Sequence, residues 1–431
     1  MTLSRRKISI HCAGIISLLC YVWLAKESRT DESVPLSLFL PLLAAPWICV
    51  LVIWFWGEKS TRYRSIIFWA ILFRLVGCWA TPIYEDDYYR FLWDGYKFSE
   101  TGDPYTGTPL EAFSDPDVPP EIVDVLDYVN HPHLPTLYGP PMEFTFLINH
   151  WLWPASLVGL KVLFLLFEAG MLFALSRMIP RKTFLLAAWC PLLIFETSFQ
   201  AHPDIIGVTF LTLGILAIRS KKPFCSMLGQ AAAMASKIFA ILTWPFLLTK
   251  DKWFLQGILA SAVSAAFYLP FLLQGSNAGL ISTKAMATDW EFNSAVYGFV
   301  KIWLSPNEAR LTCLSLFALI YFGIVGWYLR KKFNNQEVEA PLDIVYGMFF
   351  LLSPVVNSWY LLWLFPFVML KPRCWSITAL MVVSLSYVTG LNLNDPELRN
   401  FENPLIIKIV EFGAILAAAG IDIIRHRKRL D

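Results

Sequence analysis

Residues 35–56 read PLSLFLPLLAAPWICVLVIWFW, and this stretch contains no charged side chain. A transmembrane helix needs about 20 consecutive apolar residues to cross the hydrocarbon core of a bilayer, so the segment is long enough to span one. Basic residues follow it at Lys59, Arg62 and Arg64, which is typical of the cytoplasmic end of a span. The stretch therefore predicts a membrane-spanning helix.

The composition extends this prediction to the whole chain of 431 residues. Hydrophobic residues make up 56% and charged residues 16%, whereas roughly 25% of residues are charged in soluble globular proteins. These values exclude an ordinary soluble domain, a disordered chain, a collagen and a coiled coil. The net charge of +2 is too near zero to suggest a nucleic-acid partner. The eight cysteines form no CxxC pair, so we expect no disulfide framework.

Basic clusters between the apolar runs predict the orientation of the chain. Eight clusters hold 23 of the 35 basic residues, and short cytoplasmic loops carry an excess of Lys and Arg. If all eight are cytoplasmic, the spans lie at about 8–25, 35–56, 65–82, 158–178, 183–199, 204–219, 253–273, 309–329, 341–356, 359–370, 374–391 and 405–424. Both termini are then cytoplasmic, and residues 1–431 form a single polytopic membrane domain.

Two segments do not fit simple spans. Residues 225–248 lie between two basic clusters on the same side, so we expect two half-helices that meet near Ser236 and Lys237. Residues 143–155 are too short, at 1.5 Å per residue, to cross about 30 Å of hydrocarbon. We interpret them as an interfacial or re-entrant helix. The expected fold class is an all-α integral membrane protein with about 12 transmembrane helices plus interfacial and broken helices.

This orientation places residues 83–142 outside the cytoplasm, as the longest extramembrane segment. The segment holds twelve carboxylates against two basic side chains, Arg90 and Lys97. Loops of more than about 15 residues are uncommon and usually carry function. We therefore expect the catalytic motif in this extracytoplasmic loop.

The loop begins with YEDDYYRFLWDG at residues 84–95. In a helix along the membrane surface, Asp86, Arg90 and Asp94 lie on one face, with Asp87 beside them. One carboxylate can then act as a general base while Arg90 holds another, and neighbouring acids raise each other's pKa toward the range that a base needs. The alternative is an exposed helix N-terminus, where acids complement the helix dipole.

Other polar residues lie at expected helix breaks. His202 and Asp204 could contact a phosphate, bind a metal or hold a hydroxyl, or simply form a polar loop at the interface. Lys237 lies where the two half-helices meet, and an ionisable group at membrane depth indicates a functional site unless its side chain reaches water. A phosphate is its natural partner. Further candidates are Trp290 and Asn293 in one outer loop and Trp359 and Tyr360 in another, where the alternative is aromatic anchoring at the interface.

Taken in order, these motifs resemble the bacterial GT-C glycosyltransferases of the mannosyltransferase-like type. The resemblance covers about residues 80–370 and rests on DDYYRFLWDG at 86–95, GDPY at 102–105, YGPP at 138–141, His202, Asp204, Lys237, residues 290–293, Ser353-Pro354 and Trp359-Tyr360. The chain departs from the family at Gln200-Ala201, where related sequences are often Asn-rich, and at Asn357-Ser358, where they often have His-Pro.

The resemblance implies a hexosyltransferase in a bacterial inner (plasma) membrane. Such an enzyme transfers a sugar, mannose or another hexose, from a polyprenyl phosphate to a glycolipid, a glycan or another acceptor hydroxyl on the extracytoplasmic face, with inversion. By resemblance, the base is Asp86 or Asp87. The residues expected to bind substrate are Arg90, Asp94, His202, Asp204, Lys237, Trp290, Asn293, Trp359 and Tyr360. Acid pairs can also bind a divalent metal, Mg or Mn, although the spacing matches no strong metal motif.

Two other function classes remain open. A secondary transporter would also fit twelve spans, but transporters usually contain two related halves and bind their substrate at the midplane, and no such repeat is found here. A lipid-linked polymerase or ligase would be expected to have a large late loop with Arg and His, whereas the large loop here is early and acidic. In each case the partners are lipid-linked or small molecules and the bilayer itself.

Overall fold

The computed structural model describes residues 9–30, 33–57, 62–249, 252–277, 279–389 and 403–427. Every regular element named in these ranges is a helix, which confirms the all-α fold class. Phe292 and Val355 form an isolated parallel bridge.

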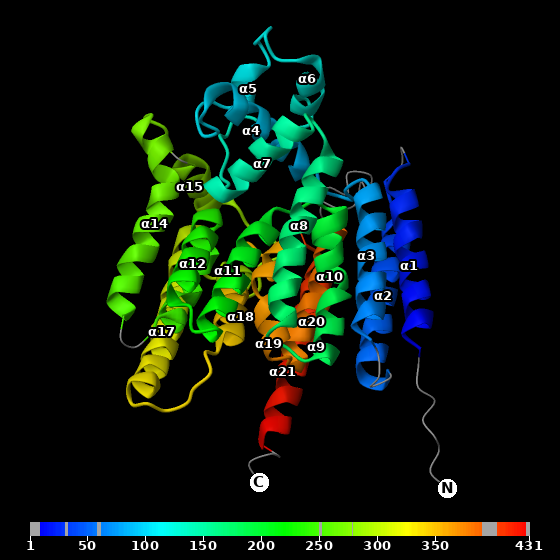
Figure 1. The fold of residues 1–431 in the computed structure, drawn as a ribbon, viewed down its shortest axis with the longest axis vertical. Coiled ribbons are helices and arrows are strands. Elements are labelled where there is room, and N and C mark those ends of the chain that lie inside the picture. The colour runs from blue at the N-terminus through cyan, green and yellow to red at the C-terminus, as the bar shows by residue number, and fades with distance from the viewer. Residues whose placement is uncertain are drawn as a thin grey trace.

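Three long helices form the N-terminal part of the bundle (Figure 1). The uncharged stretch at 35–56 forms one of them, as predicted, although Pro41 and Pro46 lie inside it. Proline is tolerated in transmembrane helices because neighbouring groups satisfy the freed carbonyls. The first helix packs against both of the others. The three helices are α1 (Ile10–Glu27), α2 (Leu36–Trp56) and α3 (Tyr63–Trp79).

An acid-rich cap covers the end of the bundle opposite the beginning of α1 and the end of α21 (Figure 1). Its helices are α4 (Asp87–Thr101), α5 (Pro109–Ala112), α6 (Pro120–Leu126) and α7 (Pro140–Leu152). The rings of Phe91 and Phe146 stack between α4 and α7 with centroids 4.9 Å apart. At Gly95 a β-carbon would lie 2.4 Å from the carbonyl oxygen of Phe146, so only glycine permits this close approach. The short helix expected at 143–155 is thus α7, packed beneath α4.

The middle of the chain contains the predicted helix break. Helix α12 ends at Ser236, Lys237 is extended with φ −158° and ψ 137°, and a 3₁₀ turn follows. Pro223 before the break and Leu247 after it line one cavity, so the segment returns to the end of the bundle from which it enters. The elements here are α8 (Leu157–Ser176), α9 (Arg181–Ala188), α10 (Pro191–Ile194), the π-helix η1 (Phe195–Phe199), α11 (Asp204–Arg219), α12 (Pro223–Ser236), η2 (Ile238–Thr243) and α13 (Trp244–Leu247).

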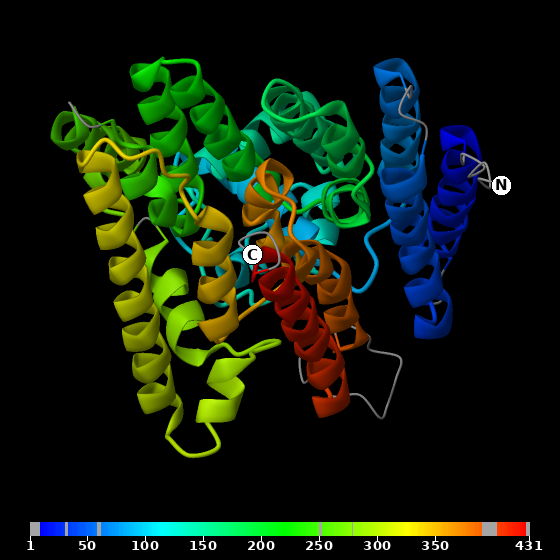
Figure 2. The same cartoon turned by 90° about the horizontal axis from the view of Figure 1, so that it is seen from below.

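The C-terminal half lies on both sides of this central part. Seen from below, α17 lies on the opposite side of the bundle from α1 and α2 (Figure 2), and α20 packs against α21. The elements are α14 (Trp253–Leu273), α15 (Leu280–Asp289), α16 (Val296–Val300), α17 (Pro306–Phe333), α18 (Leu342–Leu352), η3 (Ser358–Trp363), α19 (Phe365–Leu370), α20 (Cys374–Val382), η4 (Val383–Thr389) and α21 (Leu405–Arg427).

Among the described helices, five are long and apolar enough to cross a membrane: α1, α2, α8, α14 and α17. A sixth crossing results if α9 and the segment Pro191–Phe199, which meet at 42°, count as one. Apolar side chains on α14 and α17 face outward, including Leu273 at 78% and Leu319 at 73% exposure, as expected of surfaces in contact with lipid. The chain is therefore a helical membrane protein by these features. Most of the remaining expected spans coincide with shorter or interrupted helices, and 405–424 coincides with α21, a helix of 23 residues that carries several charged side chains. The number of twelve therefore stays a prediction.

Candidate active site

The backbone that precedes α4 is held by polar side chains from the bundle. Lys161 of α8 donates a hydrogen bond to the carbonyl of Ala80 at 2.7 Å. The Gln200 amide accepts from the N–H of Ile83 at 2.7 Å and donates to its carbonyl at 2.6 Å. Tyr84 then has φ +61°, a left-handed conformation that non-glycine residues seldom adopt outside functional or strongly held segments. The three acids that follow are placed by this constrained turn.

Glu85, Asp86 and Asp87 lie together where the cap meets the bundle. The Asn130 amide donates to Oδ1 of Asp86 at 2.7 Å and to Oδ1 of Asp87 at 2.9 Å. Burial, and then the charge of Asp87, raises the pKa of Asp86 from 3.8 to about 6. Burial and both neighbouring aspartates also raise the pKa of Glu85 well above its usual range. Asp86 therefore has the proton affinity of a base that works near neutral pH.

Arg90 positions this cluster through the backbone. Its guanidinium donates to the carbonyls of residues 130, 131 and 134 at 3.0–3.2 Å, whereas its nearest carboxylate atom, Oδ1 of Asp94, is 4.0 Å away. Arg90 therefore pairs with a carboxylate, as predicted, and that carboxylate is Asp94; its hydrogen bonds go to the loop that contains Asn130. Arg90 thus places Asn130 against the two aspartates.

Asp94 lies inside the cap with a second acid that the sequence argument did not single out. Burial raises the pKa of Asp94 to about 7 and that of Glu143 well above its usual range. Thr136 donates to Glu143 at 2.7 Å. Glu143 stands among apolar residues in α7, so only its position just after the YGPP break could have indicated it. The role of Asp94 in binding substrate remains a prediction.

His202 follows the π-helix η1, a helix type that is frequent at functional sites. Its Nδ1 lies 2.8 Å from Oε2 of Glu196, and the Tyr387 hydroxyl donates to the same carboxylate at 3.0 Å. The imidazole stacks on Trp359 with ring centroids 3.9 Å apart. A carboxylate at Nδ1 keeps the proton of a neutral imidazole there and leaves the Nε2 lone pair free. Nε2 is buried and has no hydrogen-bond partner among the described residues.

Glu85, Asp87 and His202 could hold a divalent metal. Each offers one ligand atom, and these atoms lie within 4.8 Å of one another. The free Nε2 fits such a role, and a metal-binding histidine almost always donates its other N–H to a carboxylate or carbonyl, as Glu196 provides here. One imidazole with two carboxylates suits Mn²⁺ or Zn²⁺ better than Mg²⁺. Glu85 was not among the sequence-predicted site residues; its position directly before Asp86 was the available signal.

Metal binding by this trio gives a direct prediction. His202→Ala removes a ligand, and Glu196→Gln removes the carboxylate that orients it, so both should weaken Mn²⁺ binding; loss of such an orienting group typically costs about 10- to 100-fold in affinity. Titration of purified protein with Mn²⁺, followed by electron paramagnetic resonance, measures the affinity. Asp117→Asn changes an exposed acid of the cap and is the matched control. Equal affinities in all variants would contradict the site.

Asp204 and Lys237 form a second cluster in the bundle. Lys237 donates to Oδ1 of Asp204 at 2.7 Å, and Trp363 donates to the same oxygen at 2.6 Å. The Lys237 ammonium also lies 4.1 Å from the centroid of the Tyr360 ring, a favourable cation–π distance. The second carboxylate oxygen of Asp204 is buried without a partner among the described residues. The two residues predicted separately from sequence are therefore one ion pair.

Tyr138, of the YGPP motif, lies within electrostatic reach of both clusters. Burial and then the charges of Asp87 and Asp204 raise its pKa well above the usual range. The sequence argument used YGPP only as a chain break and did not single out this hydroxyl. The three acids, His202 and the Asp204–Lys237 pair thus belong to one region at the base of the cap.

The loop at 290–293 borders this region. The Trp290 ring packs on His131 with centroids 4.8 Å apart. Asn293 donates to the Glu411 carboxylate at 3.0 Å and accepts from Asn403 at 2.7 Å. The Asn293 amide thus joins its loop to α21, and this interaction explains its burial without a substrate.

Comparison with known protein families, with curated proteins and with solved structures finds no match to this chain. The fold itself defines the class: a helical membrane protein in which an acid-rich cap meets the bundle at a cluster of carboxylates, a histidine and a lysine.

Proposed function

We propose that this protein is an integral membrane glycosyltransferase of the GT-C type. It would transfer a sugar, mannose or another hexose, from a polyprenyl phosphate to the hydroxyl of a glycolipid, a glycan or another acceptor. The observation that carries the proposal is Asp86, held by Asn130 at the base of the cap with a pKa of about 6. In this proposal the chain crosses a bacterial inner membrane about twelve times, with the cap outside and both termini in the cytoplasm.

In the proposed reaction, Asp86 takes the proton of the acceptor hydroxyl. The oxygen forms a bond to the anomeric carbon on the face opposite the phosphate, the bond from that carbon to the phosphate oxygen breaks, and polyprenyl phosphate leaves with the electron pair. Negative charge therefore grows on the phosphate, and fixed cations that face it lower the barrier. Lys237 is a partly buried cation of this region, and in this proposal it takes this role. A divalent metal held by Glu85, Asp87 and His202 would supply further positive charge.

The remaining site residues position the groups that react. Arg90 fixes the loop that contains Asn130, and Trp359 holds the plane of the His202 ring. Trp290, at the border of the site, offers an apolar surface of the kind on which sugar rings pack. These placements support binding of the substrate between the cap and the broken helix.

Sugar release from synthetic polyprenyl-phosphate donors tests the proposal. Purified protein is given mannosyl, glucosyl, arabinosyl or galactosaminyl donors together with a membrane-lipid extract as acceptor. Release from one donor, dependent on the extract, supports the transferase. Donor-independent uptake of solute into proteoliposomes, with no release from any donor, would support a transporter instead.

The pH dependence of transfer follows from the pKa of Asp86. A general base acts only when ionised, so kcat/KM should increase as the pH rises toward about 6 and level off above about 7. A base with an ordinary aspartate pKa of 3.8 would give a constant rate above about pH 5. Initial rates between about pH 4.5 and 8.5 distinguish the two profiles, and a constant rate across that range would exclude a general base with a pKa of about 6.

A further inference from the structure

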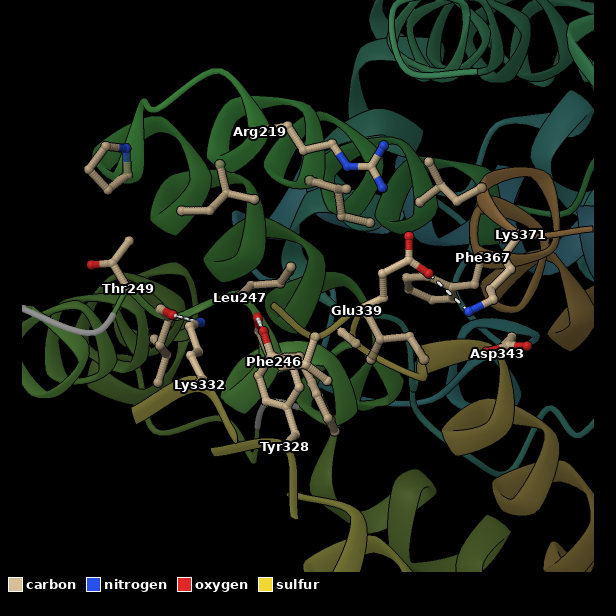
Figure 3. A pocket seen from close by; sticks show the side chains of 18 of the residues that line it. Arg219, Phe246, Leu247, Thr249, Tyr328, Lys332, Glu339, Asp343, Phe367 and Lys371 are labelled. Carbon is tan, nitrogen blue, oxygen red and sulfur yellow. Dashed lines mark hydrogen bonds and ion pairs between the residues drawn. The ribbon is translucent and has the colours of Figure 1, made fainter. Parts of the chain in front are cut away.

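A cavity of about 760 Å³ is drawn from close by in Figure 3. It lies beside the connection from α17 to α18, at the end of the bundle opposite the cap (Figure 1). It is formed by α11, α13, α17 and α19 together with the connection from α17 to α18. Much of its wall is apolar, contributed by Ile215, Phe246, Leu247, Tyr328, Leu342 and Phe367. The cavity shares no lining residue with the candidate active site, and the proposed transfer does not use it.

Five cations and two carboxylates also line this cavity. Lys371 pairs with Glu339 at 2.9 Å, as Figure 3 shows. Asp343 pairs with Arg373, which lies outside the lining, at 3.0 Å, and Lys332 donates to a backbone carbonyl. Both acids of the cavity are therefore already neutralised.

The other three cations are Arg219, Lys221 and Lys252. They have no side-chain hydrogen bond or ion pair among the described residues, and all three side chains are exposed. Arg219 ends α11, and the two lysines lie in the turns that precede α12 and α14. Three unpaired positive charges thus face one apolar cavity at a single end of the helices.

We propose that this cavity binds the phosphate-bearing headgroup of an anionic membrane lipid. The unpaired cations match the phosphate, and the apolar wall matches the beginning of the acyl chains. Basic pockets between transmembrane helices bind such headgroups, and each Lys or Arg near an anionic surface contributes about 1 kcal/mol, equivalent to about fivefold in affinity. A soluble phosphate gains nothing from the apolar wall, so the proposal is for a lipid.

Native mass spectrometry of the full chain, titrated with phosphatidylglycerol or phosphatidylcholine, tests this site. Wild-type protein should prefer phosphatidylglycerol. The triple variant Arg219→Gln, Lys221→Gln, Lys252→Gln should bind it at least tenfold more weakly. The control triple variant Arg62→Gln, Arg64→Gln, Lys222→Gln removes the same charge from exposed residues outside the lining and should change the affinity less than twofold.

A third variant changes the cavity without changing its charge. Ala340→Phe places a larger side chain in the lining and should also reduce retention of phosphatidylglycerol. Equal affinity for the two lipids, or equal loss in both triple variants, would overturn the proposal, because it would indicate general surface attraction. Displacement of the lipid by millimolar inorganic phosphate would show a site for the free anion and would overturn it as well. Thermal melting of each variant identifies a loss of folding.

Discussion

Asn in place of Asp86 is expected to lower sugar transfer by about 10²- to 10⁴-fold, the usual contribution of a positioned general base. The amide cannot take a proton, but it keeps the shape of the side chain and can still contact Asn130. Initial rates of sugar release, measured beside wild type at one protein concentration, give the effect. The thermal midpoint should be unchanged or raised, because the substitution removes a half-buried charge next to Asp87.

Asp87→Asn should also reduce transfer, but for a different reason. Asp87 belongs to the trio with Glu85 and His202, whereas Asp86 does not. Loss of Asp87 should therefore weaken Mn²⁺ binding, while Asp86→Asn should leave it within about threefold of wild type. The two variants separate base from ligand, a distinction that the sequence motif alone left open.

Asp94→Asn is the matched control for both substitutions. It changes another carboxylate of the same segment, one that pairs with Arg90 and does not belong to the trio. Transfer should fall far less than in Asp86→Asn. Retained turnover in both the Asp86 and the Asp87 variant would contradict the catalytic assignment.

Local features of this protein could be predicted from sequence because each has a local cause. The uncharged run at 35–56 forms α2, and the break at Ser236 lies where the charge pattern placed it. Both follow from hydrophobic length and the distribution of basic residues. The position of the acids before α4 also follows from the sequence, because Pro82 and a turn come between the end of α3 and these acids.

Pairings between distant segments could not be predicted, because no spacing rule connects them. Arg74 in α3 donates to Glu168 in α8 at 2.9 Å across 94 positions of the chain. The Glu196 carboxylate contacts the imidazole of His202, six residues further along the chain, and accepts a hydrogen bond from the hydroxyl of Tyr387, 191 residues further along. Arg74 and Glu196 lie in apolar segments, where an ionisable group is costly to bury, but their partners depend on how the helices pack.

The number of membrane crossings does not follow from the sequence alone, for a related physical reason. Helices such as α11 and α18, with 16 and 11 residues, are shorter than a bilayer requires. Buried inside protein, short or broken helices are stable at membrane depth because their polar groups find partners there. Hydropathy alone cannot distinguish such segments from full spans.

Lys237→Gln is expected to lower transfer by about 10²- to 10³-fold, as when one preorganised donor to a developing negative charge is removed. It should also destabilise the protein, since Asp204 is 0% exposed and would lose its ion-pair partner. Removing one partner of a buried ion pair typically costs about 3–5 kcal/mol. Release assays and thermal melting, done on the same preparation, measure the two effects.

The double variant Lys237→Gln, Asp204→Asn separates catalysis from stability. It removes both charges, so it should recover much of the lost stability and, if Lys237 acts on the phosphate, none of the lost transfer. Arg74→Gln is the matched control, because it breaks another buried ion pair, with Glu168 of α8. That variant should be destabilised to a similar degree while each folded molecule transfers sugar at the wild-type rate. If the double variant regained transfer along with stability, Lys237 would be a structural partner of Asp204. The positive charge that faces the leaving phosphate would then have to be supplied by a metal ion held by Glu85, Asp87 and His202.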